Sequence, residues 1–371
     1  MNYDYKISAS GRVNIIGDHI DYCGGKVLPF ALSMKNIVYI KANNTNKINI
    51  IFTTTDFKAS LDINKLEEYK NLKYVNYQAG CAYVWKNSGH KLIGCDILSD
   101  CHVPFGSGLS SSAAIEVSTL VALATIANDK IDKREIAILA QKAEREFANV
   151  NCGIMDQYAS ANGKKNCAML LDCKKIEHEN VMFNLGEYKL IITNCNKPHN
   201  LGDSKYNERR CETEEALNIL RKNCNIECLA DLSLDDFNRY KHLLNGKIKD
   251  RCEHVVNECN RVNEAVKALK NNDIIKLGKL LNESHYSLRD LYEVSCIELD
   301  TLQDLAISFD GCIGSRMTGG GFGGCTISIV KSNKVNDFKN YISENYKEKI
   351  GYLPSFYESD IDDGITISCI K

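Results

Sequence analysis

Two carboxylates and an imidazole lie within four residues of a turn near the start of the chain. The segment GRVNIIGDHIDYCGG spans residues 11–25, and its apolar run leads into Asp18, His19 and Asp21. We call residues 17–24 the acidic turn. A turn requires glycine, which tolerates unusual backbone angles, but it does not require three ionisable side chains. These three residues are therefore candidates for a chemical role.

A second candidate is the segment PFGSGLSSSAAIEV, of which residues 104–112 are called the serine loop. Its glycines, Gly106 and Gly108, allow the backbone to approach a ligand, and three serines precede a predicted helix. Unpaired N–H groups at a helix start attract phosphate, and a serine hydroxyl can complete the shell of a Mg²⁺ ion. The loop is not of the Walker type, because no lysine follows its second glycine. The alternative is a serine that only caps a buried helix.

A third candidate is the glycine loop, residues 319–324, in which five of six residues are glycine. Glycine weakens regular structure by roughly 0.5–1 kcal/mol per residue relative to alanine. Such a cluster before a predicted strand indicates that the backbone approaches another group closely. That group could be a ligand or another loop, and a flexible hinge is the remaining alternative.

Two further acids stand in apolar surroundings. Asp156 follows a glycine in NCGIMDQYAS and lies among Ile154, Met155 and Tyr158. A carboxylate in that setting is costly to bury unless it is paired or hydrogen-bonded. Glu144 adjoins the apolar face of a predicted helix, and taken alone it is better interpreted as a solvated helix charge.

Four of these segments together closely resemble the galactokinases of the GHMP kinase superfamily, particularly those of bacterial type. The segments are GRVNIIGDHIDYCGGKVLP, PFGSGLSSSAA, CGIMDQ and RMTGGGFGGC, and their order and spacing match. SKYNERRCE at residues 204–212 and SHYSLRDLYEVSCIELD at 284–300 also resemble galactokinase sequence. The similarity extends over nearly the whole chain.

The resemblance implies an α+β, two-domain GHMP kinase fold. The N-terminal domain would resemble domain 2 of ribosomal protein S5, and the C-terminal domain would be ferredoxin-like. ATP and sugar would bind in the cleft between them, and ATP would phosphorylate the anomeric hydroxyl of α-D-galactose. Galactose and ATP, with Mg²⁺, are the expected ligands of a monomeric cytoplasmic enzyme.

The resemblance also assigns site residues. Asp156 falls at the position of the catalytic base, and Arg12 at that of an arginine that orients it. The Mg²⁺ ligands would be Ser112 and Glu144. The expected sugar contacts are Asp18, His19, Ile20, Asp21, Gly153 and Tyr206. The expected ATP contacts are Gly106, Ser107, Gly108, Leu109, Ser110, Ser111 and Ser112. Adenine is expected near residues 53–55 or 77–85.

Three positions depart from the family pattern, and the first of them is Ser10, which replaces the usual proline. Asp18 stands where galactokinases usually have glutamate, so its carboxylate is one methylene shorter. Ile20 stands where bacterial members usually have threonine, and HIDYC is closer to the N-acetylgalactosamine kinases. Alternative functions are therefore an N-acetylgalactosamine or uronic acid kinase, another GHMP kinase such as a mevalonate or homoserine kinase, or a non-catalytic sensor of galactose and ATP.

Composition agrees with a small-molecule enzyme. The chain has 371 residues, and its 46 Lys and Arg nearly balance 48 Asp and Glu, which gives no electrostatic reason to expect a nucleic-acid or membrane partner. No apolar run reaches the roughly 20 residues of a transmembrane helix. The 17 cysteines are odd in number and scattered, and no signal segment is apparent, so reduced thiols are expected.

Hydrophobic periodicity predicts a sheet over residues 5–60, followed by helices. The predicted helices are 74–89, 111–128 and 133–150. Two β-branched runs, 323–330 and 364–370, are expected to form neighbouring strands. No linker marks a boundary, and the pattern places domains at 1–183 and 184–371.

Overall fold

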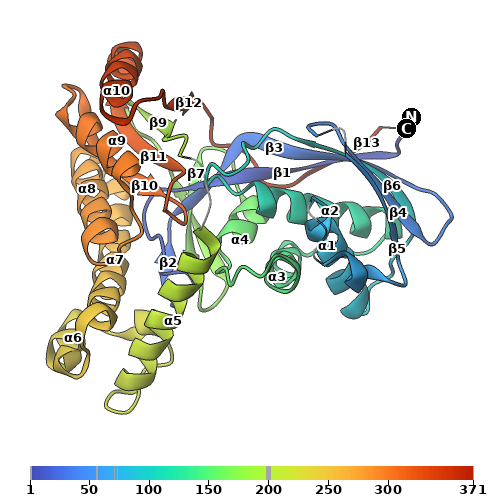
Figure 1. Cartoon of the computed structure of the whole chain (residues 1–371), viewed down its shortest axis with the longest axis horizontal. Helices are drawn as coiled ribbons and strands as arrows, with labels where there is room; N and C mark the ends of the chain where they lie inside the picture. Colours follow the sequence, from blue (N-terminus) through green and yellow to red (C-terminus); the bar gives the residue numbers. More distant parts are fainter. Residues whose placement is uncertain (1, 56, 71, 73, 198–201, 371) are drawn as a thin grey trace.

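A six-stranded sheet covered by helices on one face forms the first lobe of the molecule (Figure 1). The computed structural model describes residues 2–55, 57–70, 72, 74–197 and 202–370. The strands run in the order β13-β1-β3-β6-β4-β5, and all neighbours are antiparallel except β4 and β6. The strands are β1 (Tyr5–Asn14), β3 (Pro29–Ala42), β4 (Lys47–Phe52), β5 (Lys58–Asp62), β6 (Cys95–Cys101) and β13 (Thr366–Cys369).

Four helices pack beneath this sheet: α1 (Asn76–Asn87), α2 (Ser111–Ala127), α3 (Lys133–Ala143) and α4 (Met155–Asn162). Successive side chains of a strand point to opposite faces of the sheet, which explains why the helices pack on one face. In β3, Val38 and Ile40 are fully buried, while Tyr39 between them is partly exposed. Helix α2 is buried along most of its length. The helices predicted from periodicity are confirmed, with residues 144–148 forming a π-helical turn at the end of α3.

A small sheet lies between the lobes and contacts both of them. Its strands, in the order β2-β7-β8, are β2 (Lys26–Val27), β7 (Cys167–Asp172) and β8 (Glu177–Met182). Strand β7 packs on β3, and β8 packs on α7 (Gly246–Lys270) of the second lobe.

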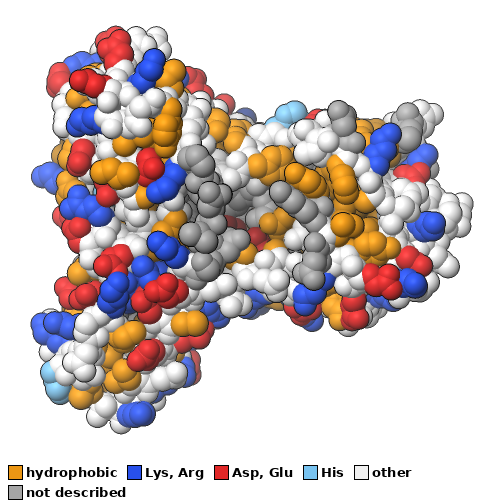
Figure 2. All heavy atoms as spheres, viewed as in Figure 1, with side chains coloured by type: hydrophobic (Ala, Val, Ile, Leu, Met, Phe, Trp, Pro, Cys, Tyr) orange, Lys and Arg blue, Asp and Glu red, His pale blue; other side chains and the backbone are white. Residues whose placement is uncertain are grey.

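The second lobe is an antiparallel sheet, β10-β11-β9-β12, backed by long helices (Figure 1). Its strands are β9 (Tyr188–Asn194), β10 (Cys312–Thr318), β11 (Cys325–Lys331) and β12 (Ser355–Tyr357). Its helices, besides α7, are α5 (Gly202–Leu220), α6 (Leu234–Tyr240), α8 (Ile274–Asp290), α9 (Ile297–Ser308) and α10 (Val335–Ile350). In Figure 2, acidic and basic side chains are interspersed over this lobe. No helix among the described residues is both long and apolar enough to cross a membrane.

The end of the chain returns to the first lobe, which corrects one expectation. Strand β13 pairs with β1, with Tyr5 opposite Cys369, so the two termini lie together in Figure 1. Strand β11 instead pairs with β9 and β10. The expectation that residues 323–330 and 364–370 are neighbours is therefore wrong. A β-branched run predicts a strand, but it does not specify that strand's partner. The predicted domain boundary at residue 183 separates β8 from β9. The last residues of the chain nevertheless return to the first lobe, where they form β13.

A buried ion pair joins the two lobes. Arg316 of β10 is fully buried, and its Nη2 lies 2.5 Å from Oδ2 of Asp18 in the acidic turn. Its Nη1 also donates to the carbonyls of Asn14 and Ile15, at 3.3 and 3.0 Å. Thr318 adds a bond to the Asn14 carbonyl at 2.9 Å. The start of the glycine loop is thereby attached to the acidic turn.

Removing Arg316 would leave Asp18 buried without its cationic partner. We expect Arg316→Met to lower the free energy of unfolding by about 3–5 kcal/mol, the usual cost of deleting one partner of a buried ion pair. Urea denaturation measures this loss. Arg289→Met is the matched control, because the Arg289–Asp290 pair is partly exposed and such pairs contribute about 0–1 kcal/mol. Equal stability losses in the two variants would contradict the assigned role of Arg316.

Candidate active site

A cleft of about 900 Å³ gathers the predicted segments from both lobes. Its lining comes from the acidic turn, the serine loop, residues 144–156, Tyr206 and the whole glycine loop. These segments are far apart in the sequence, and the fold brings them to one place. The cleft is therefore the candidate active site.

Arg12 and Asp156 form a two-pronged ion pair at the floor of the cleft. Arg12 of β1 places Nε 2.8 Å from Oδ1 of Asp156 and Nη2 2.6 Å from Oδ2. Its third nitrogen, Nη1, donates to the Gly108 carbonyl at 2.5 Å. The Arg12 side chain is 5% exposed, whereas that of Asp156 is 26% exposed. The geometry thus fixes the carboxylate and still leaves it accessible from the cleft.

The serine loop presents the start of α2 to the same cleft. Gly106, Gly108 and Ser110 all adopt positive φ angles, of 67°, 75° and 62°. Ser110 precedes the helix, but its hydroxyl does not cap it and instead donates to Oδ2 of Asp156 at 2.5 Å. The first N–H groups of α2 are therefore not used by this cap, and they can bind an anion.

Two of the seven expected ATP-contacting residues have side chains that do not line the cleft. Ser107 is buried and donates its hydroxyl to the Pro104 carbonyl at 2.7 Å. Leu109 is buried in the core, and its carbonyl accepts from the N–H of Arg12 at 3.0 Å. The other expected residues, Gly106, Gly108, Ser110, Ser111 and Ser112, all line it.

Glu144 faces the serine loop from the π-helical turn that follows α3. It is buried and accepts a hydrogen bond from Ser112. Burial and the nearby charge of Asp156 raise the pKa of Glu144, and its hydrogen bonds oppose that rise. A hydroxyl and a carboxylate beside an anion-binding helix start are the hard oxygen donors that suit Mg²⁺. The interpretation of Glu144 as a solvated charge is therefore excluded by its burial.

The acidic turn holds a neutral imidazole. His19 adopts a positive φ of 64°, and burial lowers its pKa to about 3. Its Nε2 lies 3.1 Å from the Gly320 carbonyl and its Nδ1 lies 2.8 Å from the Tyr22 hydroxyl. Because a carbonyl can only accept, the proton belongs on Nε2, and Nδ1 accepts from Tyr22. The ring of Tyr206 packs beside this imidazole, with ring centres 5.3 Å apart.

Asp21 is held against Gly153, where no side chain fits. A Cβ atom at Gly153 would lie 1.7 Å from Oδ2 of Asp21, so only glycine permits this approach. Burial, followed by the charge of Asp156, raises the pKa of Asp21 to about 6. Asp21 is consequently an electrostatically strained carboxylate beside Asp156 at the floor of the cleft.

Two of the expected sugar contacts, Asp18 and Ile20, are engaged within the fold, although Asp18 also lines the cleft. The carboxylate of Asp18 is 1% exposed and is bound on both oxygens, by Arg316 and by the N–H of Gly319 at 3.2 Å. Burial raises the pKa of Asp18, and the charges of Arg316 and Arg12 oppose the rise. Ile20 is fully buried and lies outside the cleft lining. Its carbonyl closes the turn by accepting from Cys23 and Gly25.

Sequence reasoning did not assign several residues in or beside the cleft. Asn76 and Phe322 line it, as does Tyr77 from one of the two regions expected near adenine; residues 53–55 do not. Two buried polar residues, Glu116 and Gln157, lie directly behind Glu144. A charged residue within the apolar run of α2 was the available signal for Glu116, because such a group needs a buried partner.

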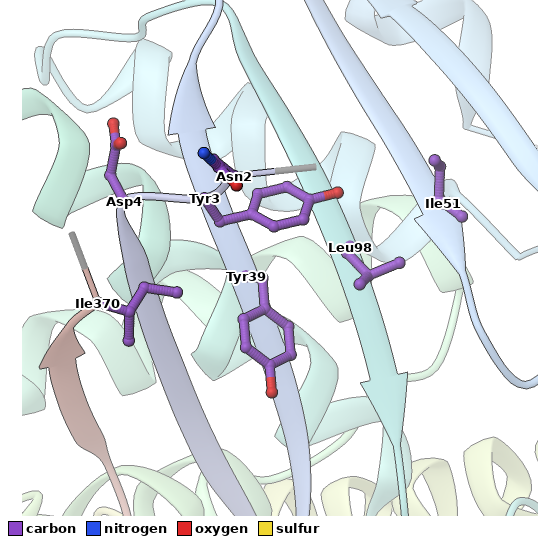
Figure 3. Close-up of a pocket in the computed structure, with 7 residues that line it drawn as sticks. All are labelled: Asn2, Tyr3, Asp4, Tyr39, Ile51, Leu98 and Ile370. Atoms are coloured by element: carbon purple, nitrogen blue, oxygen red, sulfur yellow. The ribbon is translucent and has the colours of Figure 1, made fainter.

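A second hollow, of about 730 Å³, lies on the outer face of the first sheet (Figure 3). Tyr39, Leu98 and Ile51 project there, since their neighbours along each strand face the helices. Among the described residues this lining is mostly apolar, and Asp4 is its one acid. The described lining therefore lacks the converging charges of the cleft.

Comparison with known proteins agrees with the cleft assignment. The model of the GHMP kinases N terminal domain matches residues 75–164, the galactokinase galactose-binding signature matches 2–42, and the GHMP kinases C terminal model matches 265–348. The first two cover the serine loop and the acidic turn, and the third covers the glycine loop.

Relatives match along nearly their whole length. The galactokinase of Clostridium tetani is 45% identical over 95% of this chain and 91% of its own. That of Bacillus subtilis is 40% identical over 96% and 92%. The crystal structure of Lactococcus lactis galactokinase complexed with galactose superposes with a TM-score of 0.96 at 36% identity, over 98% and 95% of the two chains. The mevalonate kinase of Methanococcus jannaschii shares the fold, with a TM-score of 0.68 at 20% identity over 98% and 99%. The chain therefore belongs to the galactokinase family of GHMP kinases.

Proposed function

We propose that this enzyme transfers the γ-phosphoryl group of ATP to the anomeric hydroxyl of α-D-galactose, giving galactose 1-phosphate and ADP. One observation carries the proposal: Asp156 lines a cleft whose lining also includes the acidic turn and the serine loop. The match to the galactose-binding signature supports galactose as the acceptor. Phosphoryl transfer depends mainly on positioning and on charge stabilisation, and this arrangement supplies both.

In this proposal Asp156 accepts the proton of the sugar hydroxyl as that hydroxyl attacks phosphorus. Arg12 and Ser110 fix the carboxylate through three hydrogen bonds, so it needs no reorganisation during the reaction. The hydroxyl proton passes to this carboxylate as the new bond to phosphorus forms and the bond to the leaving ADP breaks.

ATP is proposed to place its phosphates at the start of α2. The N–H groups of the serine loop bind the phosphate oxygens, and Ser112 with Glu144 holds Mg²⁺. Among the described residues no three His, Cys, Asp or Glu side chains are grouped to hold a metal. One carboxylate and one hydroxyl nevertheless fit Mg²⁺, which usually takes its remaining ligands from phosphates and water. Bound Mg²⁺ would neutralise charge on the transferred group.

The sugar is proposed to lie against Asp21, His19 and Tyr206. The oxygens of Asp21 and Tyr206 discriminate hydroxyl stereochemistry, because a wrong epimer leaves a buried polar group unpaired. The His19 ring, whose nitrogens bind Gly320 and Tyr22, packs beside Tyr206. Asp18 contributes mainly by holding the turn against Arg316, and Gly153 contributes by leaving room for Asp21. The enzyme is proposed to act as a cytoplasmic monomer, and its 17 free thiols fit a reducing compartment.

A sugar panel tests the acceptor. In a coupled assay of ADP release, we expect turnover with galactose at a kcat/KM at least tenfold above that with N-acetylgalactosamine, glucose or galacturonate. Preferential turnover of N-acetylgalactosamine would reassign the substrate, in keeping with Ile20 in the turn. Sugar and ATP binding without any turnover would identify a sensor instead.

Replacing Asp156 by Asn separates chemistry from binding. Asparagine keeps the shape but cannot accept the proton, so we expect kcat to fall by about 10²–10⁴-fold, the usual contribution of a general base. Galactose affinity, measured calorimetrically, should change by only a few fold. Asp310→Asn is the control, because Asp310 pairs with Lys334 on the surface of the second lobe. Unchanged kcat in Asp156→Asn would remove this residue from its proposed role.

Replacing Asp21 by Asn tests the strained carboxylate. The folded pKa of about 6 exceeds the unfolded value of about 3.9 by roughly 2 units, or about 3 kcal/mol. The folded state therefore binds the proton more tightly, and the stability of the native protein falls as pH rises from about 4 to 6. Asparagine is neutral throughout, so Asp21→Asn should be more stable than the native protein at pH 7 by up to about 3 kcal/mol.

The same variant should lose this gain on acidification and should bind galactose more weakly. Urea denaturation at pH 7 and pH 4.5 measures the gain, which should shrink at the lower pH as the native carboxyl becomes protonated. Asp310→Asn should show no gain at pH 7, since its exposed carboxylate is stabilised by Lys334. An equal gain at both pH values in Asp21→Asn would show that ionisation of Asp21 is not its cause.

A further inference from the structure

A buried amide connects two acids directly behind the serine loop. Gln157 is fully buried, and its Nε2 lies 2.5 Å from Oε2 of Glu144 and 3.2 Å from Oε2 of Glu116. Glu116 is also fully buried, within the otherwise apolar middle of α2. Burying two carboxylates and an amide is costly, and apolar side chains of similar size would avoid that cost. Their presence therefore calls for a function.

We propose that Gln157 is a positioning residue for Glu144, and that Glu116 anchors Gln157 in turn. The proposal rests on the proposed role of Glu144 as a Mg²⁺ ligand. A glutamine amide has two N–H donors, so one side chain can serve both carboxylates. Neither a methionine nor a glutamate at this position could donate to them.

The contacts specify which oxygen is held. Gln157 binds Oε2 of Glu144, and the thiol of Cys152 reaches the same oxygen at 3.4 Å. Neither group engages Oε1, and Ser112 supplies a further hydrogen bond to the same carboxylate. Orienting partners of this kind fix metal ligands in the geometry required for binding, and their loss usually weakens metal affinity about 10–100-fold.

The location of Gln157 gives the arrangement a second consequence. Gln157 follows Asp156 in the first turn of α4, so one helical turn carries both the proposed base and the group that orients the metal ligand. Glu116 lies five residues after Ser111, the first residue of α2, and links that turn to the helix that binds phosphate. The spacing between base, metal ligand and phosphate loop is therefore set by one buried chain of hydrogen bonds.

Metal affinity provides a test that does not depend on turnover. Mn²⁺ binding to the full-length enzyme, saturated with a non-hydrolysable ATP analogue, is measured by electron paramagnetic resonance. We expect Gln157→Met, which keeps the length and removes both donors, to weaken Mn²⁺ binding about 10–100-fold. Glu116→Gln retains a carbonyl acceptor for Gln157 and should weaken it by only a few fold. Galactose affinity, measured without metal, should stay within a factor of two to three in both variants.

Gln303→Leu is the matched control. Gln303 of α9 is equally buried and has no hydrogen-bond partner for its amide among the described residues, so its loss should leave Mn²⁺ affinity unchanged. If Gln157→Met does not fold, Glu116→Leu replaces it, since removing the anchor should also weaken Mn²⁺ binding. Native Mn²⁺ affinity in whichever of these two variants folds, or an equal loss of metal and galactose affinity, would overturn the proposal.

Glu144→Gln separates this inference from the proposed function. If Glu144→Gln binds Mn²⁺ as tightly as the native enzyme, the metal site itself is wrong. If Glu144→Gln weakens Mn²⁺ binding but Gln157→Met does not, the metal site stands and only the positioning role fails.

Discussion

The buried pair between Arg316 and Asp18 is the constraint on which the arrangement of the molecule depends. Each charge is removed from water, and the two hydrogen-bonded partners come from different lobes, so this contact forms only when the lobes meet as observed. The same contact places Gly319 against the acidic turn. The cleft between the lobes therefore has a defined width before any ligand arrives.

The floor of that cleft concentrates negative charge. Asp18, Asp21, Glu116 and Glu144 all have raised pKa values, chiefly because they are buried. Arg12 and Arg316 offset part of this charge. The charge that they do not offset destabilises the native state, and functional sites commonly contain groups whose pKa values are shifted in this way. A bound cation beside Glu144 and sugar hydroxyls beside Asp21 would each lower it, which couples ligand binding to stability.

The sequence was sufficient to predict most of the elements and most of the cleft. Helices α1, α2 and α3 follow from their periodicity, and the serine loop, the acidic turn and Asp156 could be found because their residue types are unusual for their setting. The pairing of β13 with β1 could not be found, because strand propensity contains no information about partners. The engagement of Asp18 was missed for a related reason: its partner, Arg316, lies 298 positions away. The burial of Ile20 away from the cleft lining could not be found either, because a motif position does not reveal which face of a turn a side chain occupies.

The segments of the chain that match the three family models differ in what those models describe. The mevalonate kinase fold extends over this whole chain at 20% identity, so the fold alone does not specify a sugar substrate. The models that name GHMP kinases cover α2 with its serine loop and the part of the second lobe that contains the glycine loop, whereas the signature that names galactose covers residues 2–42.

Arg12 and the acidic turn both lie in residues 2–42. Arg12 holds the proposed base, and the turn holds the proposed sugar contacts, so a single short stretch of chain ties acceptor selection to the chemical step. Under this proposal, a change of acceptor would have to alter the turn while preserving both the Arg12–Asp156 geometry and the contact of Arg316 with Asp18.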